Sequence, residues 1–289
     1  MPWTRARDLC KTGRVRVGGA VETDPARRLR AGDEVAIDPT APRRCAGVLP
    51  PAAIAYSDRD VVVVRKPAGV LTCPYEDGDK DTLVDRTRAA LRRERAEHER
   101  YDPVLGVVHR LDKDTTGLVV FARTLPAKRA LEQQFRRHTV LRRYFALVHG
   151  DAADSTMESL LVPDRGDGLR GSWGTFRAPL GKPPAQARRA VTHVQVVERL
   201  HAATLVECRL ETGRQHQIRI HLAEAGHPLV GELVYVRDYH GPRLDAPRPM
   251  LHAATLGFDH PRTGEPMRFE EELSEDFRAM LARLRARPV

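Results

Sequence analysis

The segment that decides the fold reads His109-Arg110-Leu111-Asp112-Lys113-Asp114-Thr115-Thr116-Gly117 and continues as Leu118-Val119-Val120-Phe121-Ala122. The continuation is wholly apolar, so it predicts a buried strand over residues 117–122. The part before it is a turn that is dense in polar side chains. Loops held by buried strands position catalytic groups, and this turn is therefore the first candidate for chemistry. Taken alone, Asp112 fits a turn-capping residue as well as a catalytic one.

A second polar cluster lies further along the chain and reads Leu210-Glu211-Thr212-Gly213-Arg214-Gln215-His216-Gln217-Ile218-Arg219-Ile220-His221. We expect a helix from Arg214 to Ala225, which would place Gln215 and Arg219 on one face with His216 beside them. His216 and His221 are five residues apart, whereas a helical zinc site uses ligands four apart. The cluster therefore predicts polar contacts to a ligand and no metal site.

The segments around the two clusters alternate between strand and helix signals. Further strands are expected over residues 60–66, 144–148 and 206–211, and helices from Asp81 to about Glu99, after the cap Thr124, and from Ser274 through Arg287. Residues 151–184 are rich in glycine, proline and charge, which predicts a mobile surface segment. The pattern is that of a protein with mixed α and β structure.

The first 38 residues read as a small basic module. We expect a helix over Thr4 to Lys11 and a hairpin whose strands are joined by Gly18-Gly19. Five cations and one acid precede Gly18, which fits a patch that faces phosphate and fits a solvated helix face equally well. A linker with Pro39, Pro42, Pro50 and Pro51 follows. We therefore divide the chain into a module over residues 1–45 and a main domain over residues 46–289.

The composition narrows the class of protein. The 289 residues carry a net charge of 48 − 39 = +9, which suits a polyanionic partner, nucleic acid first. Cys10, Cys45, Cys73 and Cys208 lie 35, 28 and 135 residues apart, too far for a zinc knuckle or a redox motif, so reduced thiols are expected. No apolar run approaches the roughly 20 residues that span a bilayer. We expect a cytoplasmic protein that does not enter the membrane.

Taken together, the motifs resemble the RluA family of pseudouridine synthases. The four matching blocks, in the family's order, are His109 to Gly117, Arg142 to Gly150, Leu210 to His221 with its continuation Gly226 to Gly231, and Met250 to Glu265. The resemblance implies an α+β fold with a mixed, largely antiparallel central sheet and flanking helices, preceded by a small α/β RNA-binding module. It also implies an isomerase that converts uridine to pseudouridine in RNA and needs neither cofactor nor metal.

The resemblance also assigns roles to residues. Asp112 is the essential carboxylate, which attacks the sugar or assists loss of its 2′ proton; Arg219 pairs with Asp112, and Tyr144 stacks on the uracil. Arg110 fills the space that the everted base leaves, and Leu251 packs beneath the tyrosine. The remaining substrate-binding residues are His109, Thr116, Arg214, His216 and Gln217. A structural ion pair, a core tyrosine and a loop-ordering arginine are the plain alternatives for Arg219, Tyr144 and Arg110.

Three departures from the family's pattern stand out. The chain begins where the second helix of the RNA-binding module would start, so we expect a shortened module. Thr116 replaces the commoner serine, and Glu232 stands where an aspartate is usual.

Two other functions compete with this interpretation. A non-catalytic RNA-binding or ribosome-assembly factor on the same fold would be expected to lack Asp112, Tyr144 or Arg219, and all three are present. A glycoside hydrolase needs paired acids, and Asp114, two residues from Asp112, makes a poor pair. Large-subunit ribosomal RNA is the favoured substrate and transfer RNA the alternative, and we expect a monomer.

Overall fold

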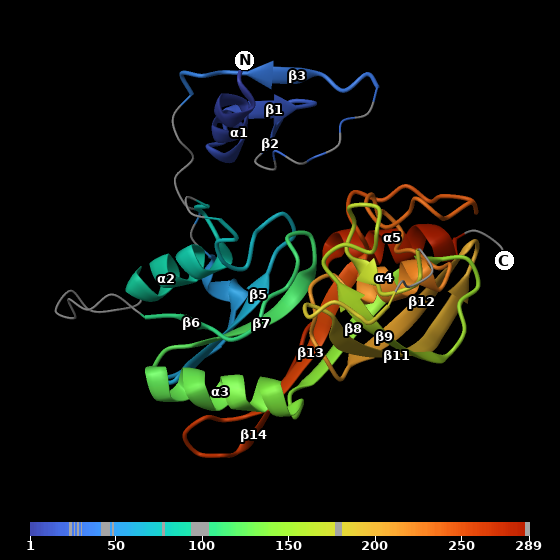
Figure 1. Cartoon of the computed structure of the whole chain (residues 1–289). Coiled ribbons are helices and arrows are strands. Elements are labelled where there is room, and N and C mark those ends of the chain that lie inside the picture. The colour runs from blue at the N-terminus through green and yellow to red at the C-terminus, as the bar shows by residue number, and fades with distance from the viewer. Residues whose placement is uncertain are drawn as a thin grey trace.

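The computed structural model describes residues 1–22, 25, 27, 29, 31–41, 47, 49–76, 79–93, 104–176 and 181–286. Within these ranges the strands form one small sheet and one sheet of eleven strands. Figure 1 shows the small sheet with the amino-terminal helix on one side of the molecule, apart from the large sheet and its helices.

The amino-terminal module contains helix α1 (Trp3–Lys11) and strands β1 (Val15–Val17), β2 (Ala20–Glu22) and β3 (Val35–Ile37), in the sheet order β2-β1-β3. Gly18 and Gly19 both have positive φ, 57° and 79°, which is the conformation that a two-residue hairpin turn requires. Leu9, Cys10 and Val17 are buried between the helix and the sheet. The predicted helix and hairpin are confirmed, and β3 adds a strand that the sequence did not indicate.

The large sheet has the strand order β10-β9-β11-β12-β8-β13-β7-β5-β4, with β14 paired to β13 and β6 paired to β7. Its strands are β4 (Ile54–Ser57), β5 (Val61–Lys66), β6 (Gly106–Val107), β7 (Thr116–Ala122), β8 (Leu141–His149), β9 (Ser155–Val162), β10 (Gly171–Ser172), β11 (Arg188–Leu200), β12 (Ala203–Leu210), β13 (Leu251–Asp259) and β14 (Pro266–Glu270). The pair β7–β13 is parallel and the other pairs are antiparallel. The expected mixed, largely antiparallel sheet is confirmed.

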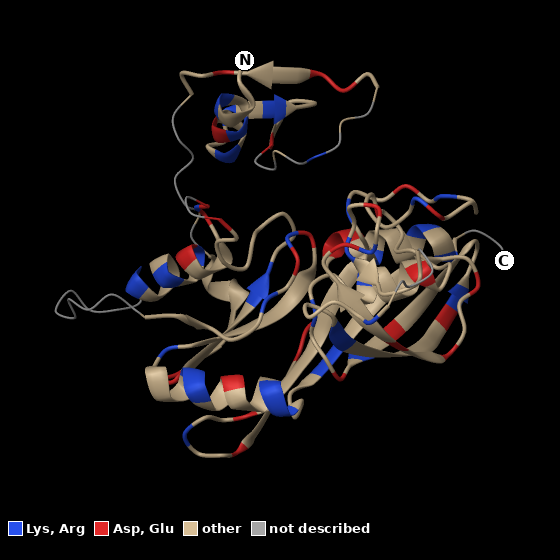
Figure 2. Cartoon of the chain, viewed as in Figure 1, with Lys and Arg blue, Asp and Glu red and all other residues tan. Residues whose placement is uncertain are grey.

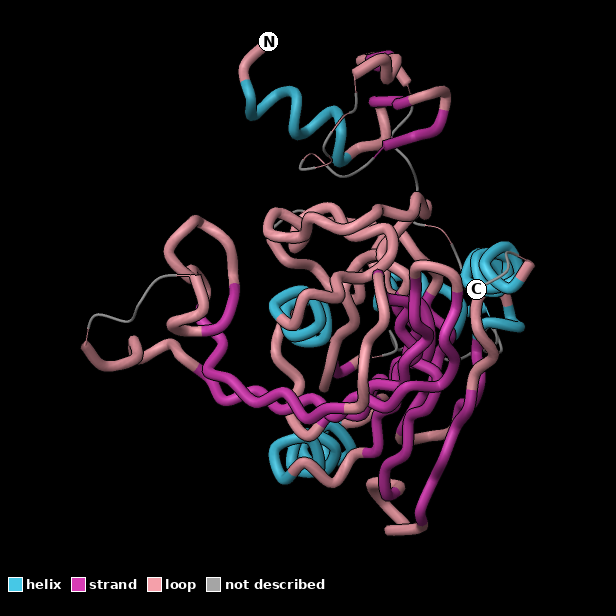
Figure 3. Tube along the Cα trace, turned by 90° about the vertical axis from the view of Figure 1, so that its right-hand side faces the viewer, coloured by secondary structure: helices cyan, strands magenta, loops and turns pink. Residues whose placement is uncertain are grey.

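Helices cover both faces of this sheet. They are α2 (Leu83–Arg93), α3 (Leu125–Arg137), α4 (Gln217–Glu224) and α5 (Glu275–Arg285), with a short 3-10 helix η1 (Pro51–Ala53) before β4. Because side chains alternate along a strand, Val62 and Val64 pack with α2 while Val61 and Val63 pack with α3. In Figure 3, α2 and α3 are seen end-on on opposite sides of the strands. By the same alternation along β8, α4 shares the core of α2, and α5 covers the opposite face.

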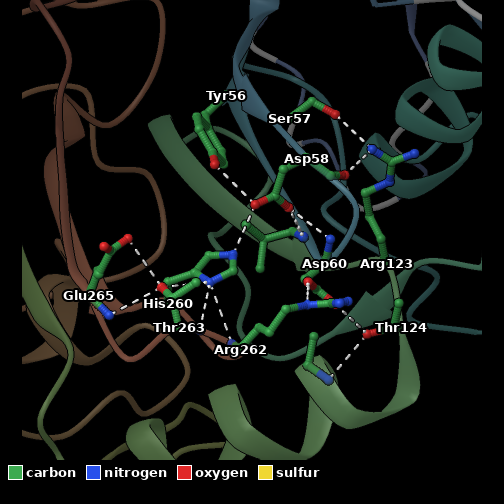
Figure 4. A network of polar contacts seen from close by, with 12 residues as sticks. Tyr56, Ser57, Asp58, Asp60, Arg123, Thr124, His260, Arg262, Thr263 and Glu265 are labelled. Atoms are coloured by element: carbon green, nitrogen blue, oxygen red, sulfur yellow. Dashed lines mark hydrogen bonds and ion pairs between the residues drawn. The ribbon is translucent and has the colours of Figure 1, made fainter.

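The edge of the sheet at β4 and β5 is tied to the turn between β13 and β14 by a polar network (Figure 4). Asp58 Oδ2 accepts from Tyr56 at 3.0 Å and lies 2.8 Å from Nε2 of His260. Asp60 accepts from Arg262 Nη2 at 2.7 Å. Asp58 also accepts two backbone N–H groups of its own turn, so the network fixes both turns against each other.

Several predicted elements differ from the structure in detail. Residues 155–162 form a regular strand, β9, inside the segment that was expected to be a mobile excursion, because β9 pairs with β10 and β11. Helix α2 begins after Thr82, which exchanges bonds with Asp85, and Asp81 instead binds Arg86. Helix α4 begins at Gln217, three residues later than predicted.

One further prediction is confirmed, and others concern residues that the structure does not describe. Thr124 caps α3 as expected, by accepting from the backbone N–H of Ala127. The expected helical residues 94–99, together with Pro42, Cys45 and Arg287, lie outside the described residues. No helix in the described part of the chain combines the length and apolarity that a membrane span needs.

Candidate active site

A cavity of about 460 Å³ opens where the turn before β7, the end of α3, strand β8 and the start of α4 meet. This volume lies in the range of sites for small ligands. Nine of the ten site residues nominated from the sequence line it: Asp112, Tyr144, Arg219, Arg110, His109, Arg214, His216, Gln217 and Leu251. Segments that are more than one hundred residues apart in the chain therefore converge on one cavity.

The turn that carries Asp112 is held from beneath by Lys66. The side chain of Lys66 is buried at the end of β5, and its Nζ donates to the carbonyl oxygens of Lys113 at 2.6 Å, Thr115 at 2.9 Å and Pro67 at 3.0 Å. Burial lowers the pKa of Lys66 to about 7, against the opposing effect of Asp114 and Asp112. The backbone of the turn is thus fixed by a buried donor that the sequence showed only as the end of a valine run.

Arg248 fixes the same turn from the other side. Its Nη1 donates to the carbonyl oxygens of Asp114 and Leu251 at 3.0 and 3.1 Å, and Asp276 at the start of α5 accepts its Nε and Nη2 at 2.6 and 2.9 Å. Burial raises the pKa of Asp276, but its bonds from Arg248 and Ser274 lower it to about 2. One guanidinium therefore joins the turn of Asp112, β13 and α5.

Thr116 does not line the cavity, in contrast to the other nominated residues. Its Oγ1 lies 2.8 Å from Nδ1 of His252 and accepts from Nη2 of Arg248 at 3.3 Å. Both Thr116 and His252 are buried. The structure gives Thr116 a supporting position under the turn, away from the space a substrate would enter.

Gln217 reaches the cavity, but the protein itself uses its amide. The side-chain oxygen accepts from Thr212 Oγ1 at 2.8 Å and from the backbone N–H of Arg214 at 3.0 Å, and the amide nitrogen donates to Val191 and Thr192 of β11. Gln217 therefore holds the loop before α4 against the sheet.

Asp112 meets Arg219 across the cavity, and a third residue joins them. Nη1 of Arg219 lies 3.5 Å from Oδ2 of Asp112. The shorter bonds of Arg219 go to Glu232, whose two carboxylate oxygens accept Nε and Nη2 at 2.8 Å each. Burial lowers the pKa of Arg219, yet Glu232 and Asp112 together raise it above its usual value, so the guanidinium stays charged. The departure from aspartate at position 232 thus supplies the bidentate partner of Arg219.

His216 and Tyr235 complete this side of the cavity. His216 precedes α4 with a positive φ of 58°, and its Nδ1 lies 2.7 Å from the hydroxyl of Tyr235. The Nε2 of His216 is 3.9 Å from Oδ1 of Asp112, and burial lowers the pKa of His216 despite that carboxylate. The imidazole is therefore neutral at neutral pH. Arg219 lies 5.3 Å above the ring of Tyr235, which burial keeps protonated by raising its pKa to about 12.

Tyr144 and Leu251 form the apolar part of the site. Tyr144 in β8 pairs in register with Cys208 of β12 and Ala253 of β13, and only 7% of the residue is exposed. Burial raises the pKa of Tyr144, so its phenol is neutral at neutral pH. Leu251 is buried at the start of the neighbouring strand. Together they offer a flat apolar surface beside a carboxylate.

The mouth of the cavity carries the guanidinium of Arg110 and one exposed aromatic ring. Arg110 is exposed and lies 6.0 Å from the ring centre of Tyr75, which is 65% exposed. Arg7 and Lys11 of α1 form ion pairs with Glu76, next to Tyr75. A second cavity of about 390 Å³ is lined by Arg7 and Lys11 on one side and by Arg110 and Asp112 on the other. Figure 2 shows the lysine and arginine positions of α1 and of α3.

The arrangement of these residues defines a class of protein. A partly buried aspartate–arginine pair, a neutral tyrosine and an exposed arginine at the rim form a site that can take one base out of a nucleic acid strand and act on its sugar. Among solved structures, Human RNA Pseudouridylate Synthase Domain Containing 4 shares the fold with a TM-score of 0.64 at 23% identity, covering 81% of this chain and 93% of that one. Human RNA Pseudouridylate Synthase Domain Containing 1 gives a TM-score of 0.58, also at 23% identity, over 82% of this chain and 95% of that chain.

Sequence comparison identifies the family. The model described as RNA pseudouridylate synthase matches residues 60–224, and the S4 domain model matches residues 4–35. The chain is 38% identical to the uncharacterized RNA pseudouridine synthase YlyB of Bacillus subtilis, over 98% of this chain and 89% of that protein. It is 34% identical to ribosomal large subunit pseudouridine synthase D of Zymomonas mobilis, over 97% and 88%. The chain therefore belongs to the RluA-type RNA pseudouridine synthases, isomerases that convert uridine to pseudouridine, and carries an amino-terminal S4 module.

Proposed function

We propose that this enzyme isomerises uridine in large-subunit ribosomal RNA, with Asp112 as the essential carboxylate. The observation that carries the proposal is the 3.5 Å approach of Arg219 to Asp112 inside a cavity that Tyr144 also lines. Relatives from several bacteria bear the name ribosomal large subunit pseudouridine synthase D, which supports ribosomal RNA as the substrate. The S4 module and the net charge of +9 support an RNA partner.

The reaction breaks the bond between N1 of uracil and C1′ of the sugar and forms a bond between C5 and C1′. The proton on C5 is lost and N1 gains one, so no redox equivalent or phosphate energy is consumed. Asp112 either attacks C1′ or takes the 2′ proton, and in both routes a carboxylate beside a developing positive charge at the sugar is favourable. Arg219 keeps that carboxylate ionised and oriented.

Tyr144, Leu251 and Arg110 handle the base. The neutral phenol of Tyr144 stacks on uracil while it rotates, and Leu251 packs against the same apolar surface. The target uridine leaves its stack at a cost of a few kcal/mol. Arg110, exposed at the mouth, takes the vacated place because its planar guanidinium both stacks and binds phosphate. His216, Arg214 and the segment from His109 contact the rest of the nucleotide. The proposal includes that the enzyme is cytoplasmic and monomeric.

Mapping pseudouridine in total RNA from cells with and without the enzyme tests the substrate. We expect one or a few positions in large-subunit ribosomal RNA to lose the modification and to regain it with the wild-type gene, but not with Asp112→Asn. Loss of pseudouridine from transfer RNA alone would show that transfer RNA, and not ribosomal RNA, is the substrate. Restoration by Asp112→Asn would overturn the role of Asp112, because that variant keeps the size of the side chain and lacks its charge.

A further inference from the structure

Arg142 is a buried cation in the wall of the active-site cavity. Only 6% of the residue is exposed, and it lines the cavity together with Asp112 and Tyr144. Its Nη2 donates to the carbonyl oxygen of Glu211 at 3.0 Å, and its Nε has no hydrogen-bond partner. Among the residues that the structure describes, no carboxylate forms an ion pair with Arg142. Burial is the main cause that lowers its pKa.

The guanidinium of Arg142 is held in place by the protein. It lies 5.6 Å from the centre of the Phe135 ring of α3. Gly213 also adjoins it, and a Cβ atom at that position would come within 2.4 Å of Nη1. The guanidinium therefore packs closely against both residues, and a larger side chain at position 213 would displace it from the cavity wall. A fixed cation needs little reorganisation when a ligand arrives.

The cavity around Arg142 is lined by a further cation, Arg214, and by two carboxylates, Asp112 and Glu132, neither of which forms an ion pair with Arg142. After burial, the interaction with Tyr144 raises the pKa of Arg142 and the charge of Arg214 lowers it. Burial followed by the charge of Arg142 lowers the pKa of His109 to about 3, so that imidazole is neutral. Arg136 lines the same cavity. A buried cation is costly unless an anion pairs with it, and the site leaves that place for an incoming group.

We propose that Arg142 binds the RNA phosphodiester that adjoins the everted uridine and so anchors the target nucleotide. Arg142 and Tyr144 are two residues apart on β8, so their side chains point to the same face about 7 Å apart. One nucleotide can bridge that separation with its base on Tyr144 and its phosphate on Arg142. This inference rests on the proposed function, since it assumes that the cavity receives a nucleotide of an RNA strand.

The salt dependence of RNA binding tests the proposal without turnover. In vitro transcribed large-subunit ribosomal RNA is titrated with wild type, Arg142→Met, Arg142→Lys and Arg59→Met, each first checked by thermal unfolding. Arg59 is an exposed cation in the turn before β5, at the opposite end of that strand from the cavity. We expect Arg142→Met to weaken binding about ten- to a hundredfold and to reduce the slope of log K against log salt by about 0.7 to 0.9. Arg142→Lys should keep the slope, and Arg59→Met should keep both values.

A second measurement locates the phosphate. A fragment around the mapped uridine is made with a neutral methylphosphonate on its 5′ or 3′ side and is bound by Asp112→Asn, which leaves the substrate intact. We expect one of the two methylphosphonate replacements to weaken binding to Asp112→Asn about tenfold. In the double variant Asp112→Asn/Arg142→Met, the same replacement should not change the affinity. If Arg142→Met does not fold, Arg142→Lys takes its place: in the Asp112→Asn background it should lose less affinity on methylphosphonate replacement than Asp112→Asn alone.

The outcomes separate this inference from the proposed function. An unchanged salt slope in a folded Arg142→Met variant overturns the inference, as does a methylphosphonate penalty that is independent of Arg142 on both sides. A reduced slope with no pseudouridine formed in that RNA would overturn the proposed substrate and leave the phosphate site standing. An unchanged slope with normal pseudouridine formation would do the reverse.

Discussion

Replacing Glu232 by glutamine keeps the size of the side chain and removes its charge. Oε1 of Glu232 accepts the backbone N–H groups of Leu233 and Val234 at 3.0 and 2.9 Å in addition to Nη2 of Arg219, while Oε2 accepts Nε of Arg219. Glutamine has one oxygen, and the backbone donors hold it at the Oε1 position. The amide nitrogen then faces Nε of Arg219, so a donor meets a donor where an ion pair was.

The cost follows from burial. The side chain of Glu232 is 1% exposed and that of Arg219 is 12% exposed, so water does not replace the lost partner. Removing one member of a buried pair destabilises proteins by about 3 to 5 kcal/mol. Arg219 also loses the anchor that points Nη1 at Asp112, and a shift of about 1 Å in such a group costs about a hundredfold in rate. We expect Glu232→Gln to fold with both losses.

Urea unfolding and tritium release from RNA labelled at C5 of uracil measure the two effects. Glu232→Asp is the matched variant, because it keeps the charge and shortens the reach by one methylene. We expect it to lose less than tenfold in rate and about 1 to 2 kcal/mol, the range of a weakened charged hydrogen bond. If Glu232→Gln matches wild type in rate and stability, or if Glu232→Asp is the worse of the two, the ion pair does not position Arg219.

The pH dependence gives an independent check. Burial raises the pKa of Glu232, but the bonds and charge of Arg219 outweigh it and lower that pKa below the usual value. The pair's contribution to the free energy of unfolding is therefore complete above about pH 4.3, the unfolded pKa, and is lost as the pH falls through the folded pKa. Glu232→Gln should lack this part of the acid dependence, so its stability should approach that of wild type as the pH is lowered.

Three further changes test the support of the site. Lys66→Met leaves three carbonyl oxygens of the turn without their donor and should cost about 3 to 5 kcal/mol in urea unfolding, with a matching loss of turnover. Gly117→Ala should prevent stable folding, because φ is 113° and the added Cβ would lie 2.2 Å from the carbonyl oxygen of Ala253. The control Gly69→Ala, at φ 77° with open space around it, should cost about 1 kcal/mol of stability. Similar soluble yields of the two variants would contradict this. Burial lowers the pKa of His252 to about 4. As the pH falls from 6.5 to 4, the unfolded chain takes up a proton that the folded chain does not, so the free energy of unfolding should fall by up to about 1.4 kcal/mol per pH unit. His252→Asn should show a smaller change of the free energy of unfolding with pH.

The local elements could be predicted because each has a signal in its own residues. The valine run of β5, the cap Thr124 and the inner face of α5 follow from short-range chemistry. Strand β9 was missed because its first six residues, Ser155 to Leu160, are exposed or half-exposed, and only its last two residues are buried. Pairing on both sides, with β10 and β11, stabilises it, and such pairing has no signature in the strand itself.

The candidate site was predicted as a set of residues but not as a geometry. Motif resemblance named Asp112 and Arg219, and the structure places them 3.5 Å apart. The partner that holds Arg219, Glu232, stood out only as a departure from the family's pattern, since a bidentate pair depends on backbone positions that the sequence does not fix. Arg142 opens one of the four matching blocks, but the sequence does not show that it is buried with no ion pair to any described residue.

The single parallel pairing of the large sheet explains why these residues meet. Strands β7 and β13 run in the same direction, with His252 aligned to Thr116. The two strands therefore begin at the same edge of the sheet, and the segments that lead into them meet there. One of those segments is the turn with Asp112, and the other leads into Leu251, the first residue of β13. Arg248 donates to a carbonyl oxygen in each, which locks their relative position before any RNA arrives. An antiparallel pairing at this point would place these segments at opposite ends of the strands, about 20 Å apart for a seven-residue strand such as β7. The carboxylate and the apolar surface for the base can therefore act on one nucleotide because of the direction of one strand.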